Sequence, residues 1–304
     1  MLFRSLEFNP DAAFTLGAGI HDSQWSIVAA NLDSRVVADE SVSFTGKDPQ
    51  AAVAALRRGI DAIRKRFDDT RLLPGIGLGL PGLVDIRTGI IKCAFDFGWN
   101  DVPFAHMVEK ALGLAAIAAN RSKVGALAEL RRFAGRGIQN LIYVTIGTGV
   151  SAGIIYHGEL YVGTNSSAGE FGHMTIVPDG PLCGCGNRGC LQELVSEKAI
   201  ANAARRRLRA GSGGVLADIA GLHPERLQAV DVLRAAEEGD ETARAVVAET
   251  ASYLAVGIGN IINLFNPELI VLGGPVAKAS PLLVDDARRE VALRALAYPL
   301  SAVE

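Results

Sequence analysis

Short apolar runs and amphipathic stretches alternate along the chain, which is typical of an α/β protein. The first half opens with three strand-like runs separated by polar turns, and we expect a meander at residues 13–20, 24–32 and 35–44. An amphipathic helix is predicted next over 48–67, capped by Asp48 and with Pro49 at its first position. Four further elements are expected in this half: buried strands at 75–80 and 114–120, a helix around 103–112 and a helix over 123–135 that Gly135 closes.

The second half repeats this order. A second meander with glycine corners is predicted at residues 140–149, 151–160 and 160–163. The elements expected after it are helices around Ile200, over 241–264 and near Asp285, with a buried strand at 269–274 before the last helix. This duplication favours two similar α/β lobes, an N-terminal lobe of residues 1–118 and a C-terminal lobe of residues 119–304. A single large α/β domain is the alternative.

Composition narrows the class of protein. The 304 residues are 49% hydrophobic and 21% charged, a globular balance that leaves room for two cores. The formal net charge of −3 provides no bulk attraction to nucleic acid or to an anionic membrane. Apolar runs such as 141–147 and 269–274 are too short to span a membrane, and no signal peptide precedes the first strand. We therefore expect a cytoplasmic protein, in which disulfides are disfavoured.

Three of the four cysteines fall within eight positions and are separated by glycines that allow a tight backbone. The cysteines are Cys183, Cys185 and Cys190, and the glycines are Gly184, Gly186 and Gly189. His173 lies upstream, and a Pro-Asp-Gly-Pro turn at 178–181 is placed to bring it back. One histidine and three cysteines form a closed zinc ligand set, so we expect a structural zinc.

Other interpretations of these cysteines fit less well. C-x-C is not the usual redox spacing, and a disulfide would leave one thiol over. Unrelated buried cysteines remain the alternative to a metal site. Cys93 stands alone after a strand and is expected to be a small core hydrophobe.

The segment 169–193 carries a resemblance to a known family. Its "GEFGHM" and "CGCGNRGCL" resemble the zinc motif of the ROK family (repressors, open reading frames and kinases). The resemblance runs from about Phe14 to Pro281 and includes "VTIGTGVSAGIIYHGELYVG", which resembles a phosphate-loop segment, together with "GLPGLVDIRTG", "DFGWNDVPF" and "INLFNPELIVLGG". It implies the duplicated actin/hexokinase-like (ribonuclease H-like) ATPase fold. The family contains both sugar kinases and sugar-responsive transcription factors.

Two positions that the kinases of this family need are altered. Their first phosphate turn is Asp-x-Gly-Gly-Thr, and by the resemblance Gly19 replaces the Asp while His21, Asp22 and Ser23 replace Gly-Gly-Thr. Side chains crowd the turn where phosphate cradling needs unhindered backbone N–H groups. A shifted register in which Asp22 holds magnesium is the alternative.

The catalytic base is altered as well. The kinases carry Asn-Asp-Ala-Asn, and this chain has Asn120, Arg121, Ser122 and Lys123. Arg121 stands where the basic Asp is expected, and a guanidinium stays protonated and cannot act as a general base. The alternative reading of Arg121 is a solvated residue of the first helical turn.

The remaining nucleotide loops are predicted to be degenerate. They comprise Gly147, Thr148 and Gly149 in the third loop and Gly273 and Gly274 before Pro275. A Gly-x-Gly turn also shapes a strand corner, so we interpret these residues as inherited architecture and expect neither ATP nor magnesium to bind.

The sugar-binding side is altered but not erased. The resemblance implies that Glu170 and His173 contact sugar hydroxyls, with His173 ligating zinc through its other ring nitrogen. The other implied contacts are Asn120, which is retained, Asp96 in place of Asn, Gln192 in place of Glu, and Arg121, whose cation favours an acidic or phosphorylated sugar. A decayed pocket that binds nothing is the alternative.

These features together favour a catalytically inactive, carbohydrate-sensing core of a ROK-type transcriptional regulator. An ATP-dependent sugar kinase of glucokinase or N-acetylhexosamine kinase type is the alternative, and a stand-alone sugar-binding protein is a third reading. Residues 1–12 are too few for a helix-turn-helix, although 6–14 resemble the junction after one, and the chain stops before a closing strand and helix. The expected partners are a sugar effector, a second copy in a homodimer or homotetramer, DNA only through a missing N-terminal domain, and no membrane.

Overall fold

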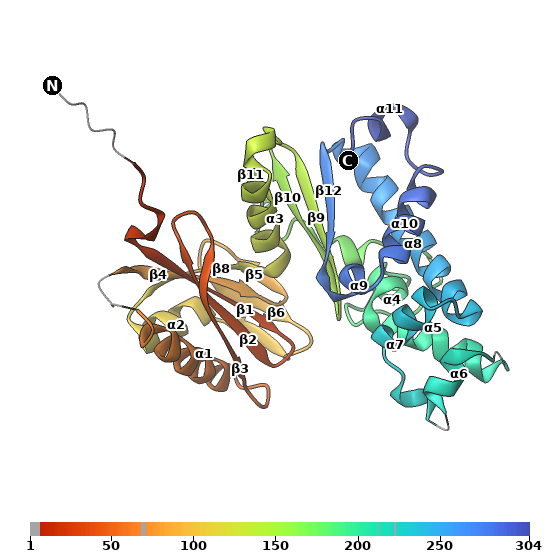
Figure 1. Cartoon of the computed structure of the whole chain (residues 1–304), viewed down its shortest axis with the longest axis horizontal. Helices are drawn as coiled ribbons and strands as arrows, with labels where there is room; N and C mark the ends of the chain where they lie inside the picture. The colour runs from red at the N-terminus through yellow and green to blue at the C-terminus, as the bar shows by residue number, and fades with distance from the viewer. Residues whose placement is uncertain (1–6, 68–70, 212, 222) are drawn as a thin grey trace. The chain divides into compact units, whose positions relative to one another are not determined.

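The computed structural model describes residues 7–67, 71–211, 213–221 and 223–304 (Figure 1). The chain forms two compact units. The first comprises Met1–Val124 and Gly163–Ser167, and the second comprises Gly125–Val162 and Ala168–Glu304. A short segment from the second half of the sequence therefore belongs to the first unit.

A five-stranded sheet in the order β3-β2-β1-β4-β8 forms the centre of the first unit. Its strands are β1 (Phe14–His21), β2 (Gln24–Asn31), β3 (Val36–Ser43), β4 (Leu72–Leu80) and β8 (Ala115–Asn120). The first three pair antiparallel, which confirms the predicted meander, whereas β4 and β8 join parallel to β1. The carboxyl ends of β1, β4 and β8 consequently lie at one edge of the sheet.

Helices α1 (Pro49–Arg64) and α2 (Phe104–Leu112) belong to this unit. The predicted start of α1 is confirmed, because the Asp48 carboxylate accepts a hydrogen bond from the Gln50 N–H and Pro49 is the first helical residue. The helix ends earlier than the predicted residue 67. Its inner face packs on the sheet, where the Trp25 indole donates a 2.8 Å hydrogen bond to the Ala52 carbonyl.

A small antiparallel sheet of the first unit was not anticipated from the sequence. Its strands are β5 (Leu83–Asp85), β6 (Ile90–Ala94) and β7 (Trp99–Val102). They are too short to show a clear alternation, so periodicity could not reveal them. The prediction that Cys93 follows a strand was wrong: it lies within β6 and is partly exposed.

The second unit has a sheet in the order β11-β10-β9-β12, which repeats the order β3-β2-β1-β4 of the first unit. Its strands are β9 (Leu141–Ile146), β10 (Val150–Tyr156), β11 (Glu159–Tyr161) and β12 (Leu269–Gly273). The pairing is antiparallel within the meander and parallel between β9 and β12. The predicted duplication of the α/β pattern is thereby seen in the strand order.

Helix α3 (Arg121–Arg132) starts directly after β8 and does not end as predicted. It stops at Arg132, and a 3₁₀ turn, η3 (Ala134–Arg136), follows. The residue that closes this segment is Gly137, at a φ of 70°, rather than Gly135, which lies inside the turn.

Helices pack beside the second sheet around the long helix α8 (Glu241–Phe265). The others are α4 (Gln192–Val195), α5 (Glu197–Arg209), α6 (Val215–Ala220), α7 (Ala229–Glu237), α9 (Gly274–Ala279), α10 (Pro281–Val291) and α11 (Ala297–Leu300). Further 3₁₀ turns are η1 (Pro10–Ala12), η4 (Phe171–His173) and η5 (Pro224–Arg226). Among the described residues, α8 is long and apolar enough to cross a membrane by length and composition. However, 61% of its apolar 18-residue stretch is buried within the protein. Its burial explains its apolar character as that of a core helix.

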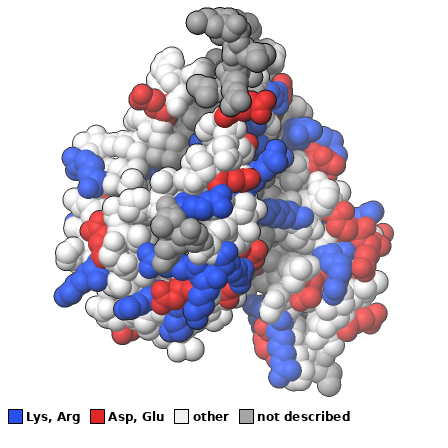
Figure 2. All heavy atoms as spheres, turned by 60° about the vertical axis from the view of Figure 1, so that its left-hand side comes forward, with Lys and Arg blue, Asp and Glu red and all other residues white. Residues whose placement is uncertain are grey.

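Basic and acidic side chains are interleaved on the molecular surface. Figure 2 shows Lys and Arg beside Asp and Glu over the visible face. On the first unit, Arg66 pairs with Glu40 at 2.7 Å and Lys92 with Asp101 at 2.8 Å. The net charge is small because 30 basic and 33 acidic residues nearly cancel, and side chains of both signs lie close together on the surface.

The packing of α8 predicts a sharp contrast between two leucines of the same helix. Leu254 is 1% exposed and Leu264 is 75% exposed. Leu254→Ala should lower the free energy of unfolding by about 2–5 kcal/mol, because it removes buried apolar surface and leaves a cavity. Leu264→Ala should change it by less than about 0.5 kcal/mol. Urea denaturation followed by circular dichroism measures both, and equal losses would contradict this role of α8.

Candidate functional site

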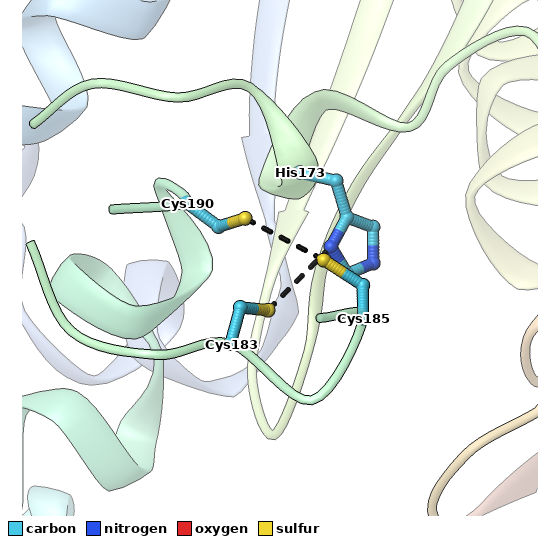
Figure 3. A group of neighbouring side chains, drawn as sticks. All are labelled: His173, Cys183, Cys185 and Cys190. Carbon is cyan, nitrogen blue, oxygen red and sulfur yellow. Dashed lines mark hydrogen bonds between the residues drawn. The ribbon is translucent and has the colours of Figure 1, made fainter. Parts of the chain in front are cut away.

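The predicted ligand cluster is assembled in the second unit. His173, Cys183, Cys185 and Cys190 each present one ligand atom, and these four atoms lie within 4.8 Å of one another (Figure 3). The Cys183 sulfur is 3.7 Å from His173 Nδ1, and the sulfurs of Cys185 and Cys190 are 3.7 Å apart. Two of the four residues, Cys183 and Cys190, are buried.

The chain folds back on itself to build this cluster. Isolated β-bridges join Thr175 to Cys190 and Leu182 to Arg188, so the segment after His173 runs beside the segment that carries the last cysteine. The predicted turn at 178–181 contributes, since the Gly180 N–H donates to the Val177 carbonyl at 2.9 Å.

One glycine of the motif is indispensable to this crossing. Gly189 has a φ of 65°, and a Cβ at this position would lie 1.5 Å from the Val177 carbonyl oxygen. Gly184 is different, because its φ is ordinary and nothing lies within 4 Å of a Cβ built there. The expectation that the glycines permit a tight backbone is therefore confirmed for Gly189, whereas backbone geometry does not explain Gly184.

The geometry fits a tetrahedral metal ion. Zn–S bonds of about 2.3 Å and a Zn–N bond of about 2.0 Å place neighbouring ligand atoms of a tetrahedron about 3.5–3.8 Å apart. The two separations of 3.7 Å fall within that interval, and all four ligand atoms lie within 4.8 Å of one another. Three sulfurs and one imidazole nitrogen could thus hold a metal ion without leaving an open ligand position.

The thiols differ in acidity according to their surroundings. Burial raises the pKa of Cys183 and raises that of Cys190 to about 12. For Cys185 burial acts in the same direction, but hydrogen bonds from the Asn187 backbone N–H and from the neighbouring thiols outweigh it, so the pKa is lowered. A cation bound here would displace the thiol protons, because metals coordinate cysteine as thiolate.

The turn η4 places Glu170 and His173 three residues apart. Glu170 precedes the turn as its N-cap and His173 is its last residue, and the His173 N–H donates to the Glu170 carbonyl at 3.0 Å. Tight packing on β10 fixes the turn: a Cβ at Gly169 would lie 2.0 Å from the Ala152 carbonyl oxygen, and one at Gly172 would lie 2.2 Å from that of Val150. The Ala152 N–H also donates to the Gly169 carbonyl at 2.8 Å.

His173 and Gln192 both approach the Cys183 sulfur. Figure 3 shows the Nδ1 edge of the His173 ring turned towards the sulfurs and the opposite ring nitrogen turned away from them. The Gln192 Nε2 lies 3.8 Å from the same sulfur. The three second-unit residues predicted to contact sugar, Glu170, His173 and Gln192, are thus gathered around η4 and the start of α4.

In the first unit, the Asn120 side chain forms its hydrogen bonds with residues of the same unit. Asn120 is 7% exposed and ends β8. Its Nδ2 donates to the Gly82 carbonyl at 2.7 Å, and its Oδ1 accepts from the N–H and the hydroxyl of Ser122. This side chain therefore caps the beginning of α3 and retains one amide hydrogen beyond these bonds.

Arg121 lies across the carboxyl edge of the first sheet. Its Nη1 donates a 2.9 Å hydrogen bond to the carbonyl of Ile20, near the end of β1. Its Cγ would be 3.7 Å from a Cβ built at Gly79, which pairs with Gly19 of the neighbouring strand. Because Gly79 and Gly19 have no side chains, they leave room for the Arg121 side chain to cross the edge of the sheet.

The other altered positions of the first unit lie in turns. Asp22, at a φ of 51°, forms the β1–β2 turn with Ser23, and its carboxylate is 3.2 Å from His21 Nδ1. Asp96 lies in the exposed turn between β6 and β7 of the small sheet.

The glycine loops of the second unit adjoin each other at the carboxyl ends of β9 and β12. Gly147 and Gly149 close their turn through a 3.0 Å backbone hydrogen bond, and Thr148 between them is exposed. A Cβ at Gly147 would lie 3.2 Å from the Pro275 ring, so this ring covers the turn. Gly274, at a φ of 88°, packs against the Ile146 backbone.

A buried polar network of the first unit escaped sequence reasoning. Lys123 is 2% exposed, and its Nζ donates to the Ser166 carbonyl at 2.9 Å. The Ser166 hydroxyl accepts from the Ile86 N–H at 3.3 Å and contacts the Asp85 carboxylate at 3.4 Å. The network fixes the segment 163–167 to the first unit. No local pattern signals it, because its members are 43 and 81 positions apart in the sequence.

Comparisons with known proteins agree with this geometry. Residues 16–303 match the model of the ROK family. A glucokinase of Halalkalibacterium halodurans is 39% identical over 229 residues, which are 74% of this chain and 69% of that protein. A xylose repressor of Caldicellulosiruptor bescii is 28% identical over 289 residues, 94% of this chain and 72% of that protein.

A solved structure supports the same assignment. A ROK family transcriptional regulator, a homolog of the E. coli MLC protein, matches with a TM-score of 0.85 at 28% identity, covering 97% of this chain and 74% of that chain. The family match spans nearly the whole sequence, and the strand order and the His-Cys cluster agree with the predicted fold. The chain therefore belongs to the ROK family and has its duplicated actin/hexokinase-like fold.

Proposed function

We propose that this chain is the effector-binding core of a ROK-type transcriptional regulator, that it senses a sugar or sugar derivative, and that it does not transfer phosphate. The observation that carries the proposal is the position of Arg121. Arg121 begins α3, and its guanidinium donates a hydrogen bond to the Ile20 carbonyl. Regulation of this kind needs only a difference in affinity between two conformations, so it requires no phosphate chemistry.

Electrostatics supports catalytic silence. A general base must accept a proton, and a guanidinium remains protonated at any working pH. Phosphoryl transfer also needs a magnesium ion held by carboxylates, whereas by family resemblance Gly19 replaces the aspartate that serves the magnesium and Arg121 replaces the aspartate that acts as the base. A fixed cation at this edge of the sheet opposes the binding of a second one. In the second unit, the Pro275 ring also packs over Gly147 and takes up space beside the glycine turn.

We propose further that the cluster in the second unit holds a structural zinc ion. His173, Cys183, Cys185 and Cys190 would be its ligands, and the 3.7 Å separations support this assignment. A zinc ion here would fix the His173 ring through Nδ1 and leave Nε2 directed away from the sulfurs.

For sugar recognition we propose candidate contact residues in each unit. In the second unit, Glu170, which precedes η4, and the second ring nitrogen of His173, which ends it, would offer an acceptor and a partner for sugar hydroxyls. In the first unit, Asn120 offers its remaining amide hydrogen and Arg121 its cation. Asp96 and Gln192 complete the proposed set. We expect the protein to be cytoplasmic and oligomeric and, as a ROK-type regulator, to act on DNA.

A sugar kinase is the second candidate function. The 39% identity to a glucokinase over 229 residues favours it, since that value exceeds the 28% identity to the xylose repressor. Identity averaged over a chain is nevertheless weaker evidence on catalysis than the residues that stand at the catalytic positions. We therefore place the regulator first, and the assay of ADP release described below decides between the two.

The zinc proposal predicts the metal content. Purified protein should contain about one zinc per chain by elemental analysis. Cys183→Ser should lower both the zinc content and the melting temperature, because it removes one of four ligands and uncouples folding from metal binding. Cys93→Ser is the matched control and should leave the zinc content unchanged, since Cys93 lies in β6 of the first unit. Zinc far below one per chain in the unmutated protein would refute the proposal.

Catalytic silence predicts the outcome of a coupled kinase assay. With ATP, magnesium and a panel of hexoses and N-acetylhexosamines, ADP release should remain at the background rate, because no residue at the catalytic position can take up the hydroxyl proton. Turnover that disappears in Asp22→Ala would show instead that Asp22 holds magnesium and that the chain is a kinase.

The sensing proposal predicts a preference for anionic ligands. In calorimetric or thermal-shift screens, acidic or phosphorylated sugars should bind more tightly than their neutral parents, by about tenfold or more, as expected for one charge-assisted hydrogen bond. Arg121→Ala should erase the preference, Glu170→Ala should weaken every ligand, and Arg58→Ala, an exposed control on α1, should change neither. If no sugar binds to fully zinc-loaded protein, a decayed pocket replaces the sensing proposal.

A further inference from the structure

Gln192 is placed to act on the metal centre rather than on a sugar alone. It begins α4 two residues after Cys190, and its Nε2 lies within hydrogen-bonding distance of the Cys183 sulfur, at 3.8 Å. The other end of its amide faces the glycine turn of the second unit, because its Oε1 would be 3.7 Å from a Cβ built at Gly149. The side chain therefore spans the distance between a ligand sulfur and this turn.

The orientation of the amide follows from its neighbours. A thiolate accepts hydrogen bonds and donates none, so the NH₂ end of the amide is favourable towards Cys183 and the carbonyl end is repelled. An amide turned the other way would bring a partial negative charge against the sulfur. The contact between Gln192 Nε2 and the Cys183 sulfur has this favourable orientation.

The electrostatics of the site explain why such a donor is needed. Three thiolates and a neutral imidazole around a divalent cation carry a net charge of −1, and Cys183 and Cys190 are buried. Backbone groups offset part of this charge, because hydrogen bonds from Cys185 and Asn187 act to lower the pKa of Cys183 and Cys185 respectively. Gln192 adds a side-chain N–H to the Cys183 sulfur.

We propose that Gln192 is a positioning residue of the metal centre, whose N–H···S hydrogen bond holds the Cys183 thiolate in place and withdraws electron density from it. The inference rests on the zinc proposed above and goes beyond it, because it assigns to Gln192 a role in retaining the metal. Two substitutions separate the parts of this role. Methionine matches the length of glutamine but has no donor, and glutamate matches its shape but replaces the donor with a negative charge.

The first measurement is the rate at which zinc leaves the folded protein for an excess of the chromogenic chelator 4-(2-pyridylazo)resorcinol. Gln192→Met should release zinc about tenfold faster than the unmutated protein, and Gln192→Glu about tenfold to a hundredfold faster, which is the usual cost of removing a residue that supports a metal ligand. Gln50→Glu is the matched control, since it makes the same charge change at an exposed position of α1 and should release zinc at the unmutated rate.

The second measurement separates a hydrogen bond to sulfur from general destabilisation. In cobalt(II)-substituted protein, the thiolate-to-cobalt charge-transfer band reports the energy of the sulfur electrons. Loss of the N–H···S bond raises that energy, so the band should move to longer wavelength in Gln192→Met and Gln192→Glu and stay in place in Gln50→Glu. A loosened fold would not shift the band in this direction while the site remains fully loaded.

The outcomes are distinguishable from those of the zinc proposal. Unmutated protein without zinc would overturn both proposals. Full zinc loading in all variants, with equal release rates and unshifted cobalt bands, would overturn the role of Gln192 and leave the zinc proposal intact. If Gln192→Glu fails to fold, as judged by circular dichroism, the uncharged Gln192→Met variant decides the question by the same two readouts.

Discussion

Three thiol groups and an imidazole must meet at one point for the motif of the second unit to exist, and most of the local structure follows from that constraint. The chain satisfies it by folding residues 173–190 back on themselves, so that Thr175 bridges to Cys190. This crossing is so close that Gly189 can carry no side chain. The same fold places η4 on β10 and α4 directly after the last cysteine, which sets the positions of Glu170 and Gln192. The residues proposed for sugar recognition and the candidate metal ligands thus depend on the same local backbone structure.

The first unit presents a comparable constraint at the carboxyl edge of its sheet. Parallel strands β1, β4 and β8 end together there, which is where α/β sheets commonly bind ligands. In this chain Arg121 extends over Gly79 to the Ile20 carbonyl, and Lys123, two residues later, is buried against the Ser166 carbonyl. Two cations at the start of α3 are thus committed to backbone acceptors of their own unit. They are compatible with an anionic effector and unfavourable for a bound magnesium ion.

The two units show how one strand order can carry different chemistry. The order β3-β2-β1-β4 recurs as β11-β10-β9-β12, with the same antiparallel and parallel pairings. The loops at the carboxyl ends differ: the first unit has the Asp22–Ser23 turn and Arg121, and the second has the glycine turn 147–149 covered by Pro275. Function in such a fold is decided by these loops rather than by the repeated sheets.

The sequence by itself determined the α/β class, both meanders, the start of α1 at Asp48 and Pro49, and the ligand set of the cluster. These features are encoded locally, by alternation, by capping residues and by the spacing of His and Cys. Local pattern failed for β5, β6 and β7, which are too short to show a period, and for the end of α3, where Gly137 and not Gly135 closes the segment. Only the tertiary structure decided that Arg121 bonds to Ile20, that Lys123 is buried against Ser166 and that Gln192 approaches the Cys183 sulfur. The first two contacts join residues many positions apart, and the third depends on how the chain between Cys183 and Gln192 turns, so each exists only once the chain has folded.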